Sequence, residues 1–177
     1  MGKVTQEIAS IKKPTLREFS SGGVVFKKTN KDILWLVCKS MPSHDYPGDY
    51  WRLPKGWIDD EDGGVSPGPI SKGEVRATEE DLRTTAEREV REEGGVKANI
   101  LRKITTIRYF MNSTRGRVMK FVTFYLMEWE SDLPEGFGFE TEEILWLTFE
   151  DAYDKLDSKN EKEVFKKAEE IYSKGRI

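Results

Sequence analysis

Residues 88–96 read Arg88-Glu89-Val90-Arg91-Glu92-Glu93-Gly94-Gly95-Val96 and hold the densest acidic cluster of the chain. With about 100° of rotation per residue in an α-helix, Glu89, Glu92 and Glu93 lie within an arc of about 100°, so their carboxylates converge on one side. Hard divalent cations such as Mg²⁺ choose oxygen ligands of this kind. The alternative interpretation is a solvated charged face, in which the two arginines pair with glutamates one turn away.

The pattern around this cluster favours a packed helix over a solvated one. Thr78 is the expected N-cap, with Asp81 three residues on as a variant capping box. Gly94-Gly95 is the expected stop. Apolar residues recur every four positions between these ends and form a stripe, at Leu82, Ala86 and Val90. We therefore expect the acidic edge of the helix to meet another element of the fold.

A second informative stretch is Trp51-Arg52-Leu53-Pro54-Lys55-Gly56. Proline followed by Lys-Gly ends a β-like run, and Gly56 allows the backbone to approach another element closely. A bare backbone carbonyl there could join a metal shell, and Lys55 could meet a phosphate. An ordinary turn is the alternative interpretation.

Elsewhere the chain alternates between β-like runs and helical patterns. Two hairpins are expected, one joining Ser21–Lys27 to Ile33–Lys39 and the other joining Lys97–Tyr109 to Val118–Glu128. A further short strand and the N-caps of two closing helices follow, at Ile144–Leu147, Thr148 and Ser158. Residues 59–77 form a polar, Gly-rich loop with almost nothing to bury. These elements predict one domain of the α+β or α/β class.

Together the two stretches resemble the Nudix box, G-x5-E-x7-R-E-U-x-E-E-x-G-U, where U is bulky and apolar. Residues 88–96 match its second half, and Glu80 stands at the required spacing before them. Gly56 resembles the start of the box, although 23 residues rather than five separate it from Glu80. Gly73 is the alternative start, with six intervening residues, but it lacks the preceding Leu-Pro-Lys. The resemblance covers about residues 18–172 and is to the Nudix hydrolases.

This resemblance implies a Nudix-type α/β/α sandwich around a mixed β-sheet. The expected domain covers residues 18–177, with residues 1–17 as an N-terminal arm and the loop at about 59–77 as an insertion in the box. It also implies an activity, the metal-dependent hydrolysis of a pyrophosphate linkage in a nucleoside diphosphate derivative. Mg²⁺ or Mn²⁺ would neutralise the phosphates and lower the pKa of a bound water.

The resemblance carries roles over to matching residues. The metal ligands are expected to be Glu89, Glu92 and Glu93, with the backbone of Lys55 and Gly56. Glu80 is expected to be an auxiliary carboxylate, Arg88 to pair with a box glutamate, and Gly56 and Gly95 to be structural. The box leaves the general base open among its own glutamates and Glu140, Glu142 and Glu143. We favour Glu142 or Glu143, an acidic surface turn being an equal alternative.

Three features resemble the diadenosine polyphosphate hydrolase branch of that family, namely LPKGW, the strand pair around Ile107–Phe110, and the closing helix from Glu161. By position, Lys120 and Lys55 would contact phosphates and Tyr109 would stack on adenine. The alternative for Tyr109 is a core or edge aromatic. The branch often has a histidine where Thr123 stands, so that role does not transfer.

A dinucleoside polyphosphate is therefore the favoured substrate. The alternatives are the 5′ end of a triphosphorylated RNA, a diphosphoinositol polyphosphate, or another nucleotide. A nucleotide-binding regulatory module without hydrolysis is the non-enzyme alternative, and the intact glutamate set argues against it.

Composition narrows the classes further. The chain has 177 residues and a formal net charge of −3, which disfavours extended nucleic-acid binding. One cysteine, Cys38, and one histidine, His44, exclude an intramolecular disulfide and a zinc site built from cysteines or paired histidines. The apolar runs are too short to span a membrane, and the N-terminus lacks an apolar signal region. We expect a cytoplasmic protein that binds a small nucleotide or polyphosphate; the oligomeric state is left open.

Overall fold

A mixed β-sheet forms the centre of the protein, whose computed structural model describes residues 15–44, 47–60 and 66–175. Within these residues seven strands form one sheet in the order β3-β2-β1-β6-β5, with β4 also paired to β1 and β7 to β2. Their bounds are β1 Leu16–Lys28, β2 Ile33–Ser40, β3 Trp51–Arg52, β4 Lys55–Trp57, β5 Val96–Ser113, β6 Gly116–Asp132 and β7 Thr141–Leu147. Strands β1 and β6 run parallel, and the other pairs are antiparallel.

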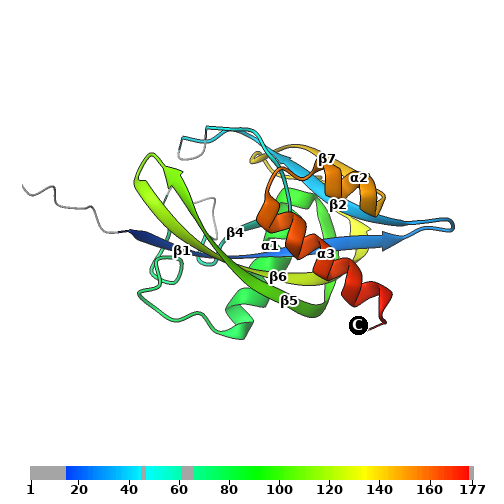
Figure 1. Cartoon of the computed structure of the whole chain (residues 1–177), viewed down its shortest axis with the longest axis horizontal. Helices are drawn as coiled ribbons and strands as arrows, with labels where there is room; N and C mark the ends of the chain where they lie inside the picture. Colours follow the sequence, from blue (N-terminus) through cyan, green and yellow to red (C-terminus); the bar gives the residue numbers. More distant parts are fainter. Residues whose placement is uncertain (1–14, 45–46, 61–65, 176–177) are drawn as a thin grey trace, which may run out of the picture.

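Helices cover both faces of this sheet (Figure 1). Helix α1 (Glu79–Gly94) packs on one face through Ala86 and Val90, against a buried cluster that includes Val25 and Met127. Helices α2 (Phe149–Lys155) and α3 (Lys159–Ser173) cover the other face, where Phe165 joins a second cluster. The expected α/β/α sandwich around a mixed sheet is confirmed.

Local signals explain where the helices begin. Thr78 accepts a hydrogen bond from the Asp81 N–H, and the Asp81 carboxylate accepts one from the Thr78 N–H, so the predicted capping box is present. Thr148 and Ser158 cap α2 and α3 as predicted. Gly95 takes the left-handed conformation at φ +66° and ends α1, which glycine allows without steric cost.

Both predicted hairpins are present, and their strands are longer than expected. Strand β1 begins at Leu16, which pairs with Val118 of β6, because β6 supplies a parallel partner along that whole stretch. Residues 1–14 of the expected arm lie outside the described residues.

The loop expected at 59–77 is anchored to the sheet at its returning end. Ser71 is fully buried; its carbonyl accepts from the Phe19 N–H (2.7 Å) and its Oγ from the Ile58 N–H (2.9 Å). The Asp59 carboxylate accepts the N–H groups of Ile70 and Ser71. Backbone groups in and around this segment are thus hydrogen-bonded, which its polar, Gly-rich composition does not indicate. Residues 61–65 lie outside the described residues.

Candidate active site

Two of the three glutamates in the acidic cluster of α1 are buried, and the third is exposed. Glu89 and Glu93 lie one turn apart on the helix face that meets the sheet and are 3% and 2% exposed. Glu92 lies at the rim, where its side chain is about half exposed (49%). The stripe of Ala86 and Val90 directs this face inward, so the same packing that holds the helix buries two carboxylates.

Arg88 binds the cluster from the preceding turn. Its Nη1 lies 2.8 Å from Glu89 Oε1 and 3.0 Å from Glu92 Oε2, and its Nη2 donates to the Trp57 carbonyl at 2.7 Å. Charge-assisted hydrogen bonds of this kind hold rotamers firmly. Arg88 therefore ties two glutamates of α1 to strand β4.

Glu93 is bound from the opposite side, by the Trp51–Gly56 stretch. Its Oε1 accepts a hydrogen bond from Arg52 Nη2 (2.5 Å), and its Oε2 accepts one from the Lys55 N–H (2.8 Å). Gly56 faces Glu89, because a Cβ built on Gly56 would lie 2.2 Å from Glu89 Oε1. A side chain at position 56 would fill the space that these carboxylates use.

The electrostatics of this cluster favour a cation. Burial, followed by the charge of Glu93, raises the pKa of Glu89 well above its usual range, even though Arg88 acts against the shift. Nowhere in the described ranges do three acidic side chains stand in a preformed metal-binding arrangement. Arginines and a backbone N–H occupy the carboxylate oxygens instead. Clustered, buried oxygen donors beside a residue without a Cβ nevertheless suit a divalent cation.

Glu140, in the loop before β7, interacts electrostatically with this cluster. Burial and the charge of Glu93 raise its pKa, while Arg52 acts in the opposite direction. Asp60, which the sequence analysis did not single out, acts on Glu140 as well. By contrast, Glu142 pairs with Lys39 Nζ at 3.0 Å, and Glu143 lies opposite Lys39 in the β2–β7 ladder.

Glu80 is not brought to the cluster. It lies in the first turn of α1, nine residues before Glu89, which is about 13 Å along the helix axis and about half a turn round it. The helix begins early, at the Thr78 cap, and this continuous helical geometry turns Glu80 away from Glu89.

Both expected phosphate contacts, Lys55 and Lys120, form buried ion pairs. Lys55 Nζ lies 2.7 Å from Glu161 Oε1 of α3. Lys120 Nζ lies 3.3 Å from Glu18 Oε2, and Arg115 also binds Glu18. Burial lowers the pKa of Lys120 to about 8. Burial would raise the pKa of Glu18, but Lys120 and the other donors outweigh it and hold this pKa below its usual value.

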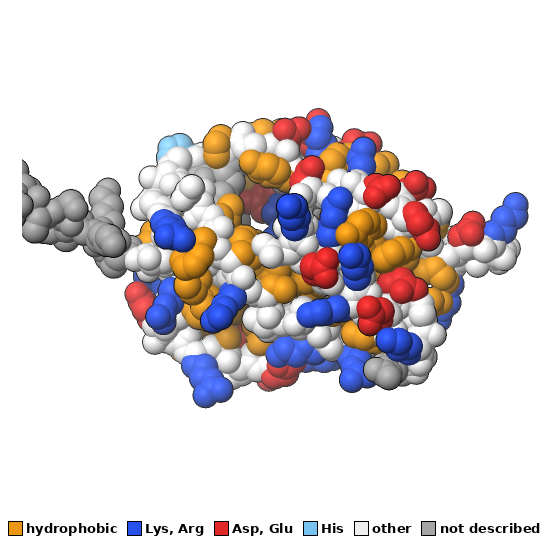
Figure 2. Space-filling model, viewed as in Figure 1, with side chains coloured by type: hydrophobic (Ala, Val, Ile, Leu, Met, Phe, Trp, Pro, Cys, Tyr) orange, Lys and Arg blue, Asp and Glu red, His pale blue; other side chains and the backbone are white. Residues whose placement is uncertain are grey.

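Tyr109 stands directly opposite Lys120 in the β5–β6 ladder and is partly buried against the core cluster below α3. Opposite residues in an antiparallel pair share a face, so Tyr109 and Lys120 lie on one side of the hairpin. In Figure 2 the surface is hollowed between this hairpin and the start of α3, with charged side chains inside the hollow.

The loop between β6 and β7 is joined to the end of α1. The Gly138 N–H donates to the Glu92 carbonyl (2.6 Å) and the Leu133 N–H to the Gly95 carbonyl (2.9 Å). A Cβ on Gly95 would lie 2.7 Å from the Phe137 nitrogen, so glycine permits this contact. These bonds fix the loop that carries Glu140 to the acidic helix.

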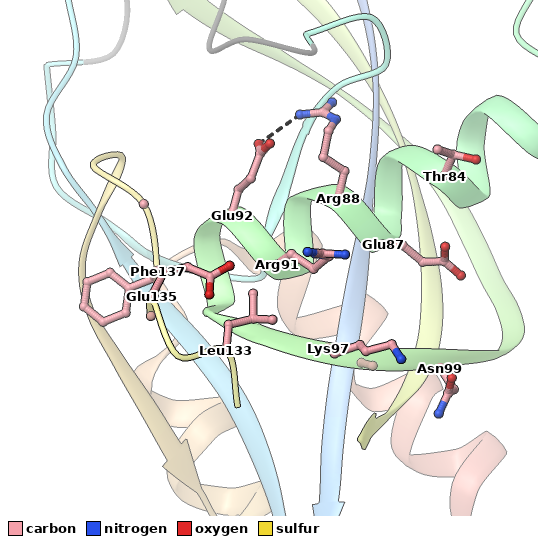
Figure 3. A pocket seen from close by; sticks show the side chains of 13 residues that line it. Thr84, Glu87, Arg88, Arg91, Glu92, Lys97, Asn99, Leu133, Glu135 and Phe137 are labelled. Carbon is pink, nitrogen blue, oxygen red and sulfur yellow. Dashed lines mark hydrogen bonds and ion pairs between the residues drawn. The ribbon is translucent and has the colours of Figure 1, made fainter. Parts of the chain in front are cut away.

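A groove of about 770 Å³ lies on the outer side of α1, between the helix, β5 and this loop. Figure 3 shows Arg91 and Glu87 facing it from the helix and Lys97 from β5. Of the three clustered glutamates, Glu92 alone is among its lining residues, together with Arg88 that pairs with it. Three cations and three anions line it in balance, which favours neither sign of ligand: Arg88, Arg91 and Lys97, with Glu87, Glu92 and Glu135.

Sequence reasoning missed Arg52, Glu18 and Glu161, although Arg52 and Glu161 stood in stretches that it quoted. A charged residue inside an apolar strand pattern, such as Glu18, is the one signal that could have pointed to a buried ion pair. None of the helices within the described residues is long and apolar enough to cross a membrane.

Comparisons with known proteins complete the description. The family model of the NUDIX domain matches residues 17–168. The fold is similar to that of a C. elegans Ap4A hydrolase binary complex (19% identity, TM-score 0.56, 88% of this chain and 98% of that chain). It is also similar to a MutT protein from Methanosarcina mazei Go1 (15% identity, TM-score 0.60, 89% of this chain and 96% of that chain). A third similar structure is the NUDIX domain of Shewanella oneidensis NrtR complexed with ADP ribose (17% identity, TM-score 0.55, 90% of this chain and 90% of that chain). No curated protein matches the chain.

Proposed function

The chain belongs to the Nudix hydrolase family, and from this premise we propose that it is a metal-dependent pyrophosphohydrolase that acts on a nucleotide, with a dinucleoside polyphosphate as the favoured substrate. The observation that carries the proposal is the pair of buried carboxylates, Glu89 and Glu93, set against Gly56. Burying two like charges side by side is costly, and a function that uses both repays it.

Glu89, Glu92 and Glu93 are the residues that would hold a divalent cation. When bound, the cation supplies charge neutralisation of the phosphates and a water of lowered pKa. Arg88 orients two of the three carboxylates and fixes them to β4. The loop bonded to the end of α1 carries Glu140, and burial together with the charge of Glu93 raises the pKa of its carboxyl. We propose Glu140, rather than Glu142 or Glu143, as the group that accepts the proton of the attacking water.

The substrate proposal has separate support. Tyr109 and Lys120 share a face of the β5–β6 hairpin, which puts a ring for a base beside a lysine that would exchange its Glu18 partner for a phosphate. Two of the similar structures are an Ap4A hydrolase and a NUDIX domain complexed with ADP ribose, both of which concern nucleotides. A base-stacking residue beside a cation suits a nucleotide better than an inositol pyrophosphate, which has no base.

The test is a substrate panel with Mg²⁺ or Mn²⁺ and product analysis. The panel holds diadenosine tetraphosphate, ADP-ribose, nucleoside triphosphates, a 5′-triphosphate RNA and a diphosphoinositol polyphosphate. We expect hydrolysis of diadenosine tetraphosphate, reduced by orders of magnitude in Glu92→Gln. Glu87→Gln, the same change on the same helix outside the cluster, is the control and should keep its activity. Absence of hydrolysis across the panel, or full activity in Glu92→Gln, would contradict the proposal.

A further inference from the structure

Arg52 has an unusual position beside the acidic cluster. It lies on β3, opposite Cys38 of β2, and its side chain is 23% exposed. Its Nη2 donates to Glu93 Oε1 at 2.5 Å. Its Nε is buried and finds no hydrogen-bond partner among the described residues. A partly buried guanidinium thus makes its hydrogen bond to one oxygen of an expected metal ligand.

Glu93 has no oxygen left without a donor. Arg52 takes Oε1, and the Lys55 N–H takes Oε2. The Lys55 backbone N–H carries no full charge, whereas the Arg52 guanidinium does. A dication at the same carboxylate would therefore repel the guanidinium strongly at so short a separation. A divalent cation at Glu93 would have to share Oε1 with the Arg52 guanidinium, so the two cations compete for this carboxylate.

The two arginines of the site differ in how firmly they are held. Arg88 bonds two glutamates and the Trp57 carbonyl, so three acceptors fix its guanidinium. Within the described residues, Arg52 has one hydrogen-bond partner, Glu93, and its Nε has none. It also lies within the field of Glu140, which offers a second acceptor close by. Moving Arg52 away from Glu93 therefore costs fewer hydrogen bonds than moving Arg88.

We propose that Arg52 is a built-in counter-cation: it holds Glu93 in the metal-free protein, competes with the divalent cation for that carboxylate, and leaves it when the cation binds. This inference rests on the proposed metal dependence. It makes Arg52 a positioning residue that lowers the metal affinity of the site. It also keeps the buried Glu93 carboxylate neutralised when no metal is present. An unpaired charge buried at this position would be energetically costly.

The test measures binding of Mn²⁺ alone, without substrate, by calorimetry on the full chain. Arg52→Gln removes the competing charge and keeps hydrogen-bonding capacity. We expect its affinity for Mn²⁺ to be about tenfold higher than that of the unchanged protein, the equivalent of one lost charge-assisted hydrogen bond. Arg91→Gln removes the same charge from the residue next to Glu92 and is the matched control. We expect its Mn²⁺ affinity to change by about twofold or less, because screened surface charges couple weakly.

The outcomes separate this inference from the proposed function. If the unchanged protein binds Mn²⁺ and Arg52→Gln binds it equally or more weakly, the counter-cation role is overturned while metal dependence stands. If neither protein binds Mn²⁺ in the millimolar range, both proposals fail. An equal gain in Arg52→Gln and Arg91→Gln would also overturn the specific role, because it would report net charge alone.

A second measurement tests the proposal on the unchanged protein, so it remains available if Arg52→Gln folds poorly. The arginine Nε–Hε resonances of the unchanged protein are recorded by NMR and titrated with Mg²⁺. We expect the Arg52 signal, assigned by triple-resonance experiments on the isotope-labelled protein, to shift on Mg²⁺ addition while the Arg88 signal shifts less. An Arg52 signal that stays in place at saturating Mg²⁺ would overturn the release step.

Discussion

Lys55 and Glu161 form a buried ion pair that joins strand β4 to helix α3, with Nζ and Oε1 2.7 Å apart and side chains 11% and 4% exposed. Glu161 Oε2 also accepts the Leu53 N–H at 2.8 Å. Because the Lys55 N–H in turn donates to Glu93, a continuous series of contacts runs from α3 through this stretch to α1. The helix farthest along the chain therefore positions a residue of the acidic cluster.

Glu161→Gln should lower the free energy of unfolding by about 3 kcal/mol, because it leaves the buried Lys55 cation without a charged partner. Urea unfolding monitored by tryptophan fluorescence measures the change. Glu163→Gln on the same helix is the control: this glutamate is 66% exposed, and we expect a change within about 0.5 kcal/mol. Equal effects of the two substitutions would show that the Lys55–Glu161 pair contributes no more than a surface pair.

The lowered pKa of Lys120 predicts that the free energy of unfolding increases at alkaline pH. Its pKa is about 8 in the folded chain, against an ordinary value of 10.5. Between these values the unfolded chain holds a proton that the folded chain has released, so the free energy of unfolding rises with pH. This contribution is complete above pH 10.5 and is lost as the pH falls through 8.

The measurement compares the unchanged protein with Lys120→Met by urea unfolding at pH 8, 9 and 10. We expect the stability of the unchanged protein to rise by about 2 kcal/mol more than that of the variant over this interval. Glu18 keeps Arg115 and Trp57 as partners in the variant. Lys167→Met, an exposed lysine on α3, should follow the unchanged protein. Parallel curves for all three proteins would contradict the lowered pKa.

Local patterns were sufficient for the helix and hairpin predictions and insufficient for the ion pairs. The Thr78 cap, the Ala86 and Val90 stripe and the Gly95 stop act within a few residues, so they are readable from the sequence. The Glu93–Arg52 bond joins residues 41 positions apart, and no periodicity records it. The helical arc correctly grouped Glu89 with Glu93, but it could not show which donors face them.

The predictions of the general base and of the phosphate contacts were limited in the same way, because both depend on contacts between distant segments of the chain. The sequence favoured Glu142 or Glu143 over Glu140, because it does not show how the loop before β7 is joined to Glu92. Lys55 looked available for a phosphate, because the position of α3 relative to β4 is a property of the packed sheet and not of either segment.

Cys38 should be unreactive until the chain unfolds. It is fully buried beneath α1, and burial raises the pKa of its thiol far above the usual range, so no thiolate is available. Ellman's reagent should label less than one thiol in ten within minutes in the native protein and one thiol per chain in urea. Labelling of the native protein at the rate of a free thiol would show that the α1 face opens readily.

Ser71 should carry much of the stability contributed by the 66–77 segment. Ser71→Ala removes the acceptor of the buried Ile58 N–H, and we expect a loss of about 1–3 kcal/mol in urea unfolding. Ser66→Ala, at an exposed position of the same segment, is the control and should cost about 0.5 kcal/mol or less. A neutral Ser71→Ala would mean that the segment rests on the sheet without stabilising it.

Tyr109 offers the sharpest test of the substrate. If its ring stacks on a base, Tyr109→Ala should raise KM for diadenosine tetraphosphate more than it lowers kcat, because stacking is made in the ground and transition states alike. The expected loss is about 1–3 kcal/mol, and Tyr109→Phe, which keeps the ring, should lose little of it. A diphosphoinositol polyphosphate has no base, so its KM should not change. Because Tyr109 also packs against the cluster below α3, unfolding of each variant is measured in parallel. Equal weakening of all substrates together with a lower Tm would make Tyr109 a scaffold residue, and the preference for a dinucleoside polyphosphate would then lose its structural support.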